Sequence, residues 1–200
     1  MSTVLPVIYG KSNIPNEGDL VFTRLDPIAN DVTVDAKPDF YDGARLENLD
    51  KRVQEDLGNF IIPTGHVSAP VVPNFFLEAK APRGGADIAK RQACYNGALG
   101  ARAMHQLQSY TQAPVYDGKG YTISTTYHAG TGTMQMYTTH PTEGPRGSTE
   151  YHMTQVRAFA LTGSLDTFRQ GATAFRNARD WAQEQRVAFI PAANERALLT

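Results

Sequence analysis

Two charged side chains at the end of an apolar segment are the first residues whose types and spacing could do chemistry. Glu78 and Lys80 follow the apolar run at 75–77, and this composition predicts a buried strand over Phe75–Lys80. Because side chains alternate along a strand, Phe76, Glu78 and Lys80 share one face, with the two charged residues about 6.7 Å apart. Charges are costly to bury without partners. Glu78 and Lys80 could therefore pair with each other, or converge on a metal ion or a phosphate.

A second carboxylate precedes this strand in the chain. Asp39 follows Pro38 after a short alternating stretch at 32–37. Two carboxylates and a lysine around one point suit metal-dependent phosphodiester hydrolysis, because carboxylates hold Mg²⁺ and the metal activates a bound water. A lysine can orient or deprotonate the attacking water. Taken alone, Asp39 fits a turn better than a metal site, because aspartate in a turn bonds to the local backbone.

A long helix is predicted over residues 87–110, directly after the candidate strand. Gln92 and Tyr95 share a face of this helix with Ile88 and Leu99, so they either contact a substrate or pack in the core. A basic set flanks the presumed site and is expected to contact nucleic-acid phosphates; it comprises Arg83, Lys90, Arg91 and Arg102.

These motifs resemble the signature of the PD-(D/E)XK nuclease superfamily. Pro38-Asp39 matches the first half of the signature, and Glu78-Ala79-Lys80 matches the second. Gln92 and Tyr95 resemble, at a spacing one residue shorter, the glutamine–tyrosine pair on the following helix in the exonuclease-like branch. Longer stretches resemble a group of fungal PD-(D/E)XK nuclease-like domains; they are 37–44, 74–82, 91–98, 151–155 and 168–181.

The resemblance implies a restriction-endonuclease-like α/β fold, with an αβββαβ core around a mixed central sheet, extra antiparallel strands and a C-terminal helix. It implies that Asp39, Glu78 and the backbone carbonyl of Ala79 bind Mg²⁺ or Mn²⁺. Lys80 would serve the attacking water, and Gln92 would position water or phosphate. Tyr95 would support Gln92 at the substrate.

The implied substrate is nucleic acid, with DNA favoured over RNA. The alternative is a weak or inactive nuclease-like domain that binds nucleic acid or protein within a larger protein. Two departures from the superfamily pattern bear on this choice. Asp39 and Glu78 are 39 positions apart (78 − 39), which is wide. The acidic residue that many members carry before the first strand has only Glu17 and Asp19 as candidates here.

The composition of the chain limits the kinds of binding site and the cellular compartments that we expect. The 200 residues include 19 basic and 20 acidic side chains and a single cysteine, Cys94. Balanced charge restricts any nucleic-acid site to a local patch, and one cysteine excludes an internal disulfide. No segment has the pattern of a signal peptide or of a membrane span. We expect a soluble protein in the nucleus or the cytoplasm, either as a homodimer or within a parent protein.

The remaining pattern predicts one domain over residues 20–200 after an irregular arm at 1–19. The expected strands are 20–25, 32–37, 120–128, 133–140 and 150–161, and the expected helices besides 87–110 are 46–57 and 165–189. Gly58 is expected to end the helix at 46–57. Asp42 is interpreted as a turn residue and Cys94 as a small buried apolar residue. The last helix carries an arginine stripe, interpreted as a solvated face or a track for phosphates: Arg169, Arg176, Arg179 and Arg186.

Overall fold

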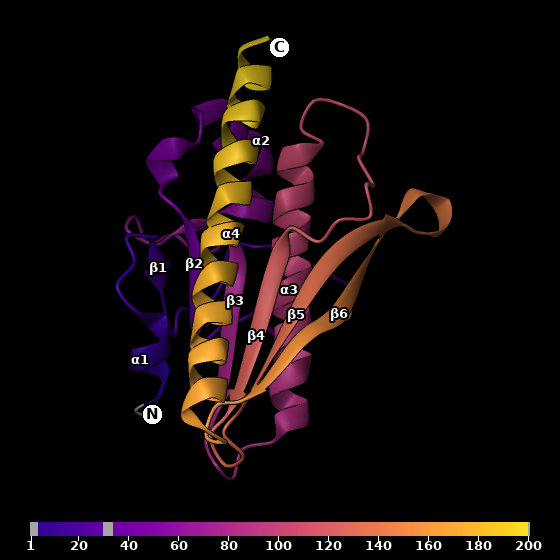
Figure 1. Ribbon diagram of the computed structural model, residues 1–200. Helices are drawn as coiled ribbons and strands as arrows, with labels where there is room; N and C mark the ends of the chain where they lie inside the picture. Colours follow the sequence, from indigo (N-terminus) through magenta and orange to yellow (C-terminus); the bar gives the residue numbers. More distant parts are fainter. Residues whose placement is uncertain (1–3, 30–33, 200) are drawn as a thin grey trace.

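One mixed six-stranded sheet separates two long helices (Figure 1). The computed structural model describes residues 4–29 and 34–199. The strands lie in the same order in the sheet as in the chain: β1 (Asn16–Glu17), β2 (Phe40–Ala44), β3 (Val71–Lys80), β4 (Thr122–His128), β5 (Thr133–Glu143) and β6 (Thr149–Ala160). Strands β3 and β4 pair in parallel, and the other neighbours are antiparallel.

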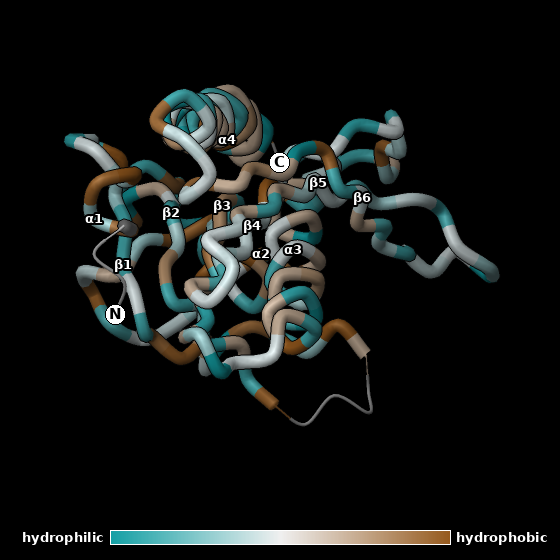
Figure 2. The backbone as a smooth tube through the Cα atoms, turned by 60° about the horizontal axis from the view of Figure 1, so that its bottom comes forward, coloured by the Kyte–Doolittle hydropathy of each residue, from teal (hydrophilic) through white to brown (hydrophobic). Residues whose placement is uncertain are grey.

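The parallel pair requires a crossover, because a tight turn cannot join two strands that run in the same direction. Helix α3 (Ala86–Gln108) makes this crossover and packs on one face of the sheet, while α4 (Leu165–Leu199) packs on the other (Figure 2). The remaining helical segments are α1 (Val4–Tyr9), η1 (Leu46–Asn48), α2 (Lys51–Ile61) and η2 (Pro145–Gly147).

Alternation along β3 divides the core between these two helices, as the sequence predicts. Phe75 meets Phe175 of α4 edge to face, with ring centroids 5.1 Å apart. The side chains of Phe76 and Glu78 turn to the other face, where Phe76 approaches Gly100 of α3. The strand therefore presents an apolar face to α4 and delivers Glu78 to α3.

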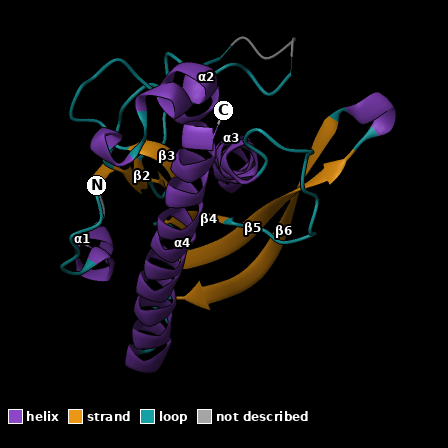
Figure 3. Cartoon of the chain, turned by 90° about the horizontal axis from the view of Figure 1, so that it is seen from above, coloured by secondary structure: helices purple, strands orange, loops and turns teal. Residues whose placement is uncertain are grey.

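The β5–β6 hairpin extends beyond the body of the domain. Figure 3 shows the far part of these two strands projecting away from the helices, with η2 at the tip. Most side chains of β6 are exposed, and β6 forms one edge of the sheet.

The predicted helix at 87–110 and the three later strands are confirmed within a few residues. Phe40–Ala44 lies outside the expected strands but is a strand in the structure. The strand expected at 20–25 is absent, and of the strand expected at 32–37 the described residues 34–37 are also irregular; residues 32 and 33 lie outside the described part. The arm at 1–19, expected to be irregular, contains α1 and β1.

Two helix ends differ from the prediction. Helix α2 continues past Gly58, because Ile61 extends the buried stripe of Val53 and Leu57, and this burial outweighs a glycine cost of about 1 kcal/mol. Helix α4 runs through Pro191 to Leu199, ten residues beyond the predicted end at 189. In the described part of the chain, no helix has the length and apolar character that crossing a membrane requires.

Candidate active site

The register of β2 and β3 brings Asp39 beside Glu78. Phe40 pairs with Leu77 in antiparallel fashion, so the residue before Phe40 comes opposite the residue after Leu77. The amide nitrogen of Ala79 donates a 2.6 Å hydrogen bond to Oδ2 of Asp39. The two carboxylates predicted from sequence are thus neighbours across one strand pair, although 39 positions separate them.

Glu78 is 1% exposed, and its two carboxylate oxygens have different partners. Asn96 of α3 donates a 2.7 Å hydrogen bond to Oε1. The ammonium of Lys80 lies 3.5 Å from Oε2, close enough for an ion pair, and Oε2 has no hydrogen-bond partner among the described residues. One oxygen is therefore fixed by the helix, while the other is held by charge alone.

Burial and, after it, the negative charge of Asp39 raise the pKa of Glu78 from 4.5 to about 7, against the opposing effects of Lys80 and Asn96. A carboxyl group with this pKa holds a proton for much of its time near neutral pH. A cation placed between Asp39 and Glu78 would relieve the same repulsion, because it favours the ionised form of both groups.

The donors at this point fit a hard divalent ion. Oxygen ligands from Asp39 and from Oε2 of Glu78 suit Mg²⁺ or Mn²⁺, which keep several waters when few protein ligands are present. Within the described ranges, no group of three or more histidine, cysteine, aspartate or glutamate side chains gathers at metal-binding spacing. The carbonyl of Ala79 as a further ligand stays a prediction.

The two helix residues singled out from sequence lie in different surroundings. Gln92 is one helical turn before Asn96, and its buried Oε1 has no hydrogen-bond partner among the described residues. Tyr95 packs against the apolar cluster that contains Phe22 and Leu99, and burial raises the pKa of its phenol. Gln92 is thus on the same side of α3 as the link to Glu78, whereas Tyr95 belongs to the core.

The four residues of the basic set also lie in different surroundings, three of them exposed and one buried. Arg83 and Lys90 are exposed near the start of α3, and the exposed Arg91 pairs with Asp87 at 2.8 Å. Arg102 is only 7% exposed, and its guanidinium donates to the backbone carbonyls of Asp26 and Pro27. Arg102 is therefore not placed to contact nucleic acid as expected, because it is buried and two of its guanidinium nitrogens hold an internal loop.

Sequence reasoning missed two residues next to the carboxylates. Asn96 could have been found, because it follows Gln92 by four positions and so lies on the same helical face. Tyr9 stacks on Phe40 with ring centroids 4.6 Å apart, and burial together with the charge of Asp39 raises the pKa of its phenol to about 12. No local pattern indicates this approach of Tyr9 to Asp39.

Three other interpretations are corrected. Asp42 is fully buried and accepts two 2.8 Å hydrogen bonds from the guanidinium of Arg179, so it is no turn residue. Cys94 is exposed. The arginine stripe of the last helix is no solvated face, since Arg179 and Arg186 are 3% and 1% exposed. Arg176 donates to the carbonyls of α1.

Fold and site together define a mixed α+β domain with a carboxylate–lysine cluster at the junction of β2, β3 and α3. The chain belongs to the family described as a domain of unknown function (DUF7924), whose model matches residues 15–193. The comparison with curated proteins and the comparison with solved structures each gave no match.

Proposed function

We propose that the protein is a metal-dependent nuclease of the PD-(D/E)XK type that hydrolyses phosphodiester bonds in DNA or RNA. The observation that carries this proposal is the convergence of Asp39, Glu78 and Lys80 at one point, where Oε2 of Glu78 accepts no hydrogen bond from any residue that the structure describes. A buried carboxyl group with a raised pKa, as Glu78 has, is typical of functional sites.

The order of elements also supports the proposal. A helix precedes three antiparallel strands, and a crossover helix then leads to a strand parallel to the third. With α2 inserted between β2 and β3, this order is similar to the αβββαβ arrangement that the resemblance implies. The proposal is also supported by the positions of the motif residues, since Asp39 directly precedes β2 and Glu78 and Lys80 lie at the end of β3.

In this mechanism Asp39 and Glu78 hold Mg²⁺ or Mn²⁺, which when bound lowers the pKa of water and offsets charge on the phosphoryl oxygens. Asn96 orients the Glu78 carboxylate by fixing Oε1. Lys80 donates to the attacking water or to a phosphoryl oxygen, and its neighbour Glu78 keeps the ammonium directed at the site. The exposed Arg83 and Lys90 contact the phosphate backbone.

The test is cleavage of labelled duplex DNA, single-stranded DNA and RNA with Mn²⁺, Mg²⁺ or EDTA. We expect metal-dependent cleavage that Asp39→Ala and Lys80→Ala abolish while both variants stay folded. Lys51→Ala serves as a matched control, because Lys51 is an exposed lysine of α2 outside the cluster. Equal loss of thermal stability and of activity in both site variants would contradict the assignment.

A second candidate is a nuclease-like domain that binds nucleic acid or protein without cleaving it. It is favoured by the small number of acidic side chains at the site within the described residues. Titration with Mn²⁺ separates the two candidates. If the carboxylates bind Mn²⁺, the folded protein becomes more stable as the concentration of Mn²⁺ rises. Both candidates are compatible with a location in the nucleus or the cytoplasm. Both are also compatible with a homodimer or with a domain of a larger parent protein.

A further inference from the structure

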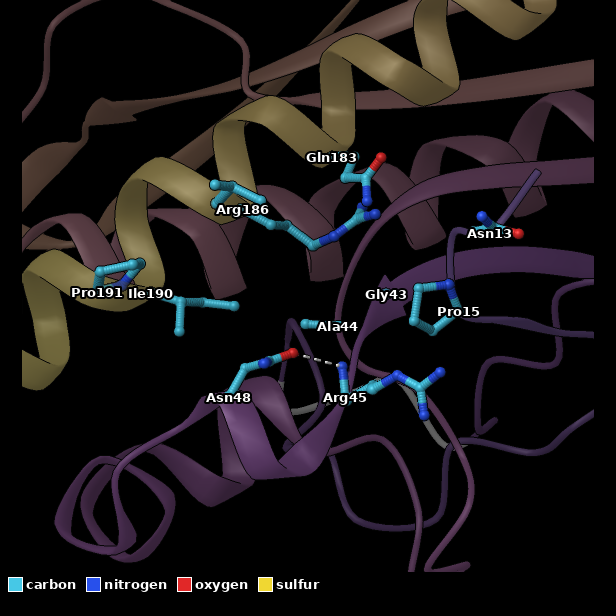
Figure 4. Close-up of a pocket in the computed structure, with 11 residues that line it drawn as sticks. Asn13, Pro15, Gly43, Ala44, Arg45, Asn48, Gln183, Arg186, Ile190 and Pro191 are labelled. Atoms are coloured by element: carbon cyan, nitrogen blue, oxygen red, sulfur yellow. Dashed lines mark hydrogen bonds between the residues drawn. The ribbon is translucent and has the colours of Figure 1, made fainter.

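A second polar site lies on the α4 side of the sheet, away from the candidate active site. A pocket of about 390 Å³ opens between α4 and the segment from Gly43 to Asn48 (Figure 4). Gly43 and Ala44 end β2, whereas Asp39 precedes its first residue. The pocket and the carboxylate pair are therefore at opposite ends of one strand.

Arg186 is the unusual residue of this pocket. Figure 4 shows its side chain extending from α4 into the space between that helix and the segment of Gly43 and Ala44. Its Nη1 donates to Oδ1 of Asn74, but Nη2 has no hydrogen-bond partner among the described residues. Arg186 is 1% exposed, so bulk solvent does not reach the unpaired nitrogen. An unpaired buried cation of this kind is unfavourable unless something else neutralises it.

The nearest acidic group cannot neutralise Arg186. Asp42 is the buried carboxylate on this side, and its two oxygens are both taken by the bidentate pair with Arg179. Two buried guanidinium groups thus share one buried carboxylate, which leaves one positive charge over. Burial lowers the pKa of Arg186 to about 10; the charge of Asp42 opposes this effect in part, and the charge of Arg179 adds to it. The guanidinium is still charged at neutral pH.

The walls of the pocket favour an anion with an apolar body. Of the described residues that line it, two are arginines and none is acidic, since Arg45 adds an exposed second cation. The apolar part of the lining comes from Pro15, Ala44, Val187, Ile190 and Pro191. Gln183 is half-buried and lies beside the guanidinium in Figure 4, so rotation of this side chain would open Nη2 to the pocket.

We propose that this pocket binds a small organic carboxylate, with its anionic head on Arg186 and its aliphatic or aromatic body against the apolar wall. One carboxylate supplies the single negative charge that the two arginines and Asp42 lack. A carboxylate also matches the donor geometry of a guanidinium. The volume is at the small end of ligand pockets, which suits an acid of a few carbons.

Thermal unfolding of the intact chain in hexanoate, benzoate, inorganic phosphate or sodium chloride at matched ionic strength tests this proposal. We expect hexanoate and benzoate to raise the unfolding temperature with concentration, while phosphate and chloride do not. Arg186→Met should lose this response. Nuclease activity is not the readout, so the result is independent of the proposed function.

A matched pair of variants at the pocket mouth keeps the test decisive if Arg186→Met fails to fold. Val187 lines the pocket and is 64% exposed, so Val187→Glu and Val187→Gln should both fold. A carboxylate at this position repels an anionic ligand, and we expect Val187→Glu to weaken hexanoate binding about threefold or more relative to Val187→Gln. Equal binding by these two variants, no response to either organic acid, or an equal response to chloride would each overturn the proposal. An equal response to phosphate would overturn the assignment of an organic carboxylate.

Discussion

Asn96 donates a 2.7 Å hydrogen bond from its side-chain amide to Oε1 of Glu78, and this bond joins α3 to the strand that carries the candidate site. Glu78 is 1% exposed, so its orientation depends on protein groups rather than on water. Fixing Oε1 leaves Oε2 on the side of Lys80, 3.5 Å from the ammonium. The helix thus sets which oxygen of Glu78 is available for chemistry.

Replacing Asn96 tests this relationship. Asn96→Ala leaves a buried carboxylate oxygen without its donor, which costs about 1–3 kcal/mol of stability. In the wild type, the hydrogen bond from Asn96 stabilises the ionised form of Glu78. Without this bond the pKa of Glu78 should rise, so the variant should lose more stability at pH 8 than at pH 5. Urea unfolding at both pH values measures this, with the exposed Asn177→Ala as control. An equal loss at the two pH values would contradict the role of Asn96.

The pKa of Glu78 predicts how stability depends on pH. Its value in the folded protein is about 7, above the ordinary 4.5, so the folded state holds a proton that the unfolded chain has released between these values. The free energy of unfolding therefore falls as pH rises from about 4.5 to about 7, by about 3 kcal/mol from this group.

Glu78→Gln removes the titrating group and serves as the reference for this prediction. Unfolding of both proteins in EDTA from pH 4 to pH 8 should give curves that separate across this range, with the wild type losing stability relative to the variant as pH rises. Parallel curves would show that Glu78 titrates near its ordinary pKa. Addition of Mn²⁺ at pH 8 should restore stability to the wild type alone, because the metal replaces the proton.

Much of the site was predictable, because its residues sit on strongly patterned elements. The apolar run before Glu78 predicts the strand, its alternation predicts the shared face with Lys80, and the helical period predicts α3. The structure brings Asp39 to this strand, as the motif implies. Asn96 follows from the same helical period once Gln92 is considered.

The missed elements depend on partners far away in the sequence. Phe40–Ala44 is buried along its whole length, so it shows no alternation, and its Asp-Gly step looks like a turn. Asp42 is explained only by Arg179, 137 positions later. Conversely, residues 20–25 have strand-like composition but make only isolated backbone hydrogen bonds, such as the bond from the amide of Phe22 to the carbonyl of Ala36. Local pattern cannot separate these cases.

The buried pair of Asp42 and Arg179 should be among the most sensitive points of the fold. Asp42→Ala leaves a buried guanidinium unpaired and should cost about 3–5 kcal/mol in urea unfolding. Asp87→Ala is the matched control, because it breaks the exposed pair with Arg91 and should change stability by less than about 1 kcal/mol. The double variant Asp42→Leu with Arg179→Met should recover part of the loss. Similar small effects at both pairs would contradict the burial of this charge pair.

Replacing either of two helical glycines with alanine should change the stability of the protein, in opposite directions. A methyl group at Gly97 of α3 would lie 2.5 Å from Oγ1 of Thr139 and 2.8 Å from Oγ of Ser124, whereas at Gly58 of α2 it would meet only Ile62 at 3.9 Å. Gly58→Ala should therefore stabilise the protein by about 0.5–1 kcal/mol through helix propensity. Gly97→Ala should destabilise it by about 1–2 kcal/mol, because overpacking outweighs the same gain.

Urea unfolding of both variants measures these two effects. Gly97 is next to Asn96, so a helix pushed off the sheet also lengthens the bond to Glu78. If Asn96 orients Glu78 for the proposed cleavage, Gly97→Ala should lower activity more than its loss of stability explains, while Gly58→Ala should leave activity unchanged. Stabilisation by both substitutions would show that α3 does not press on β4 and β5 at this point, and the close approach that positions Asn96 would then need another cause.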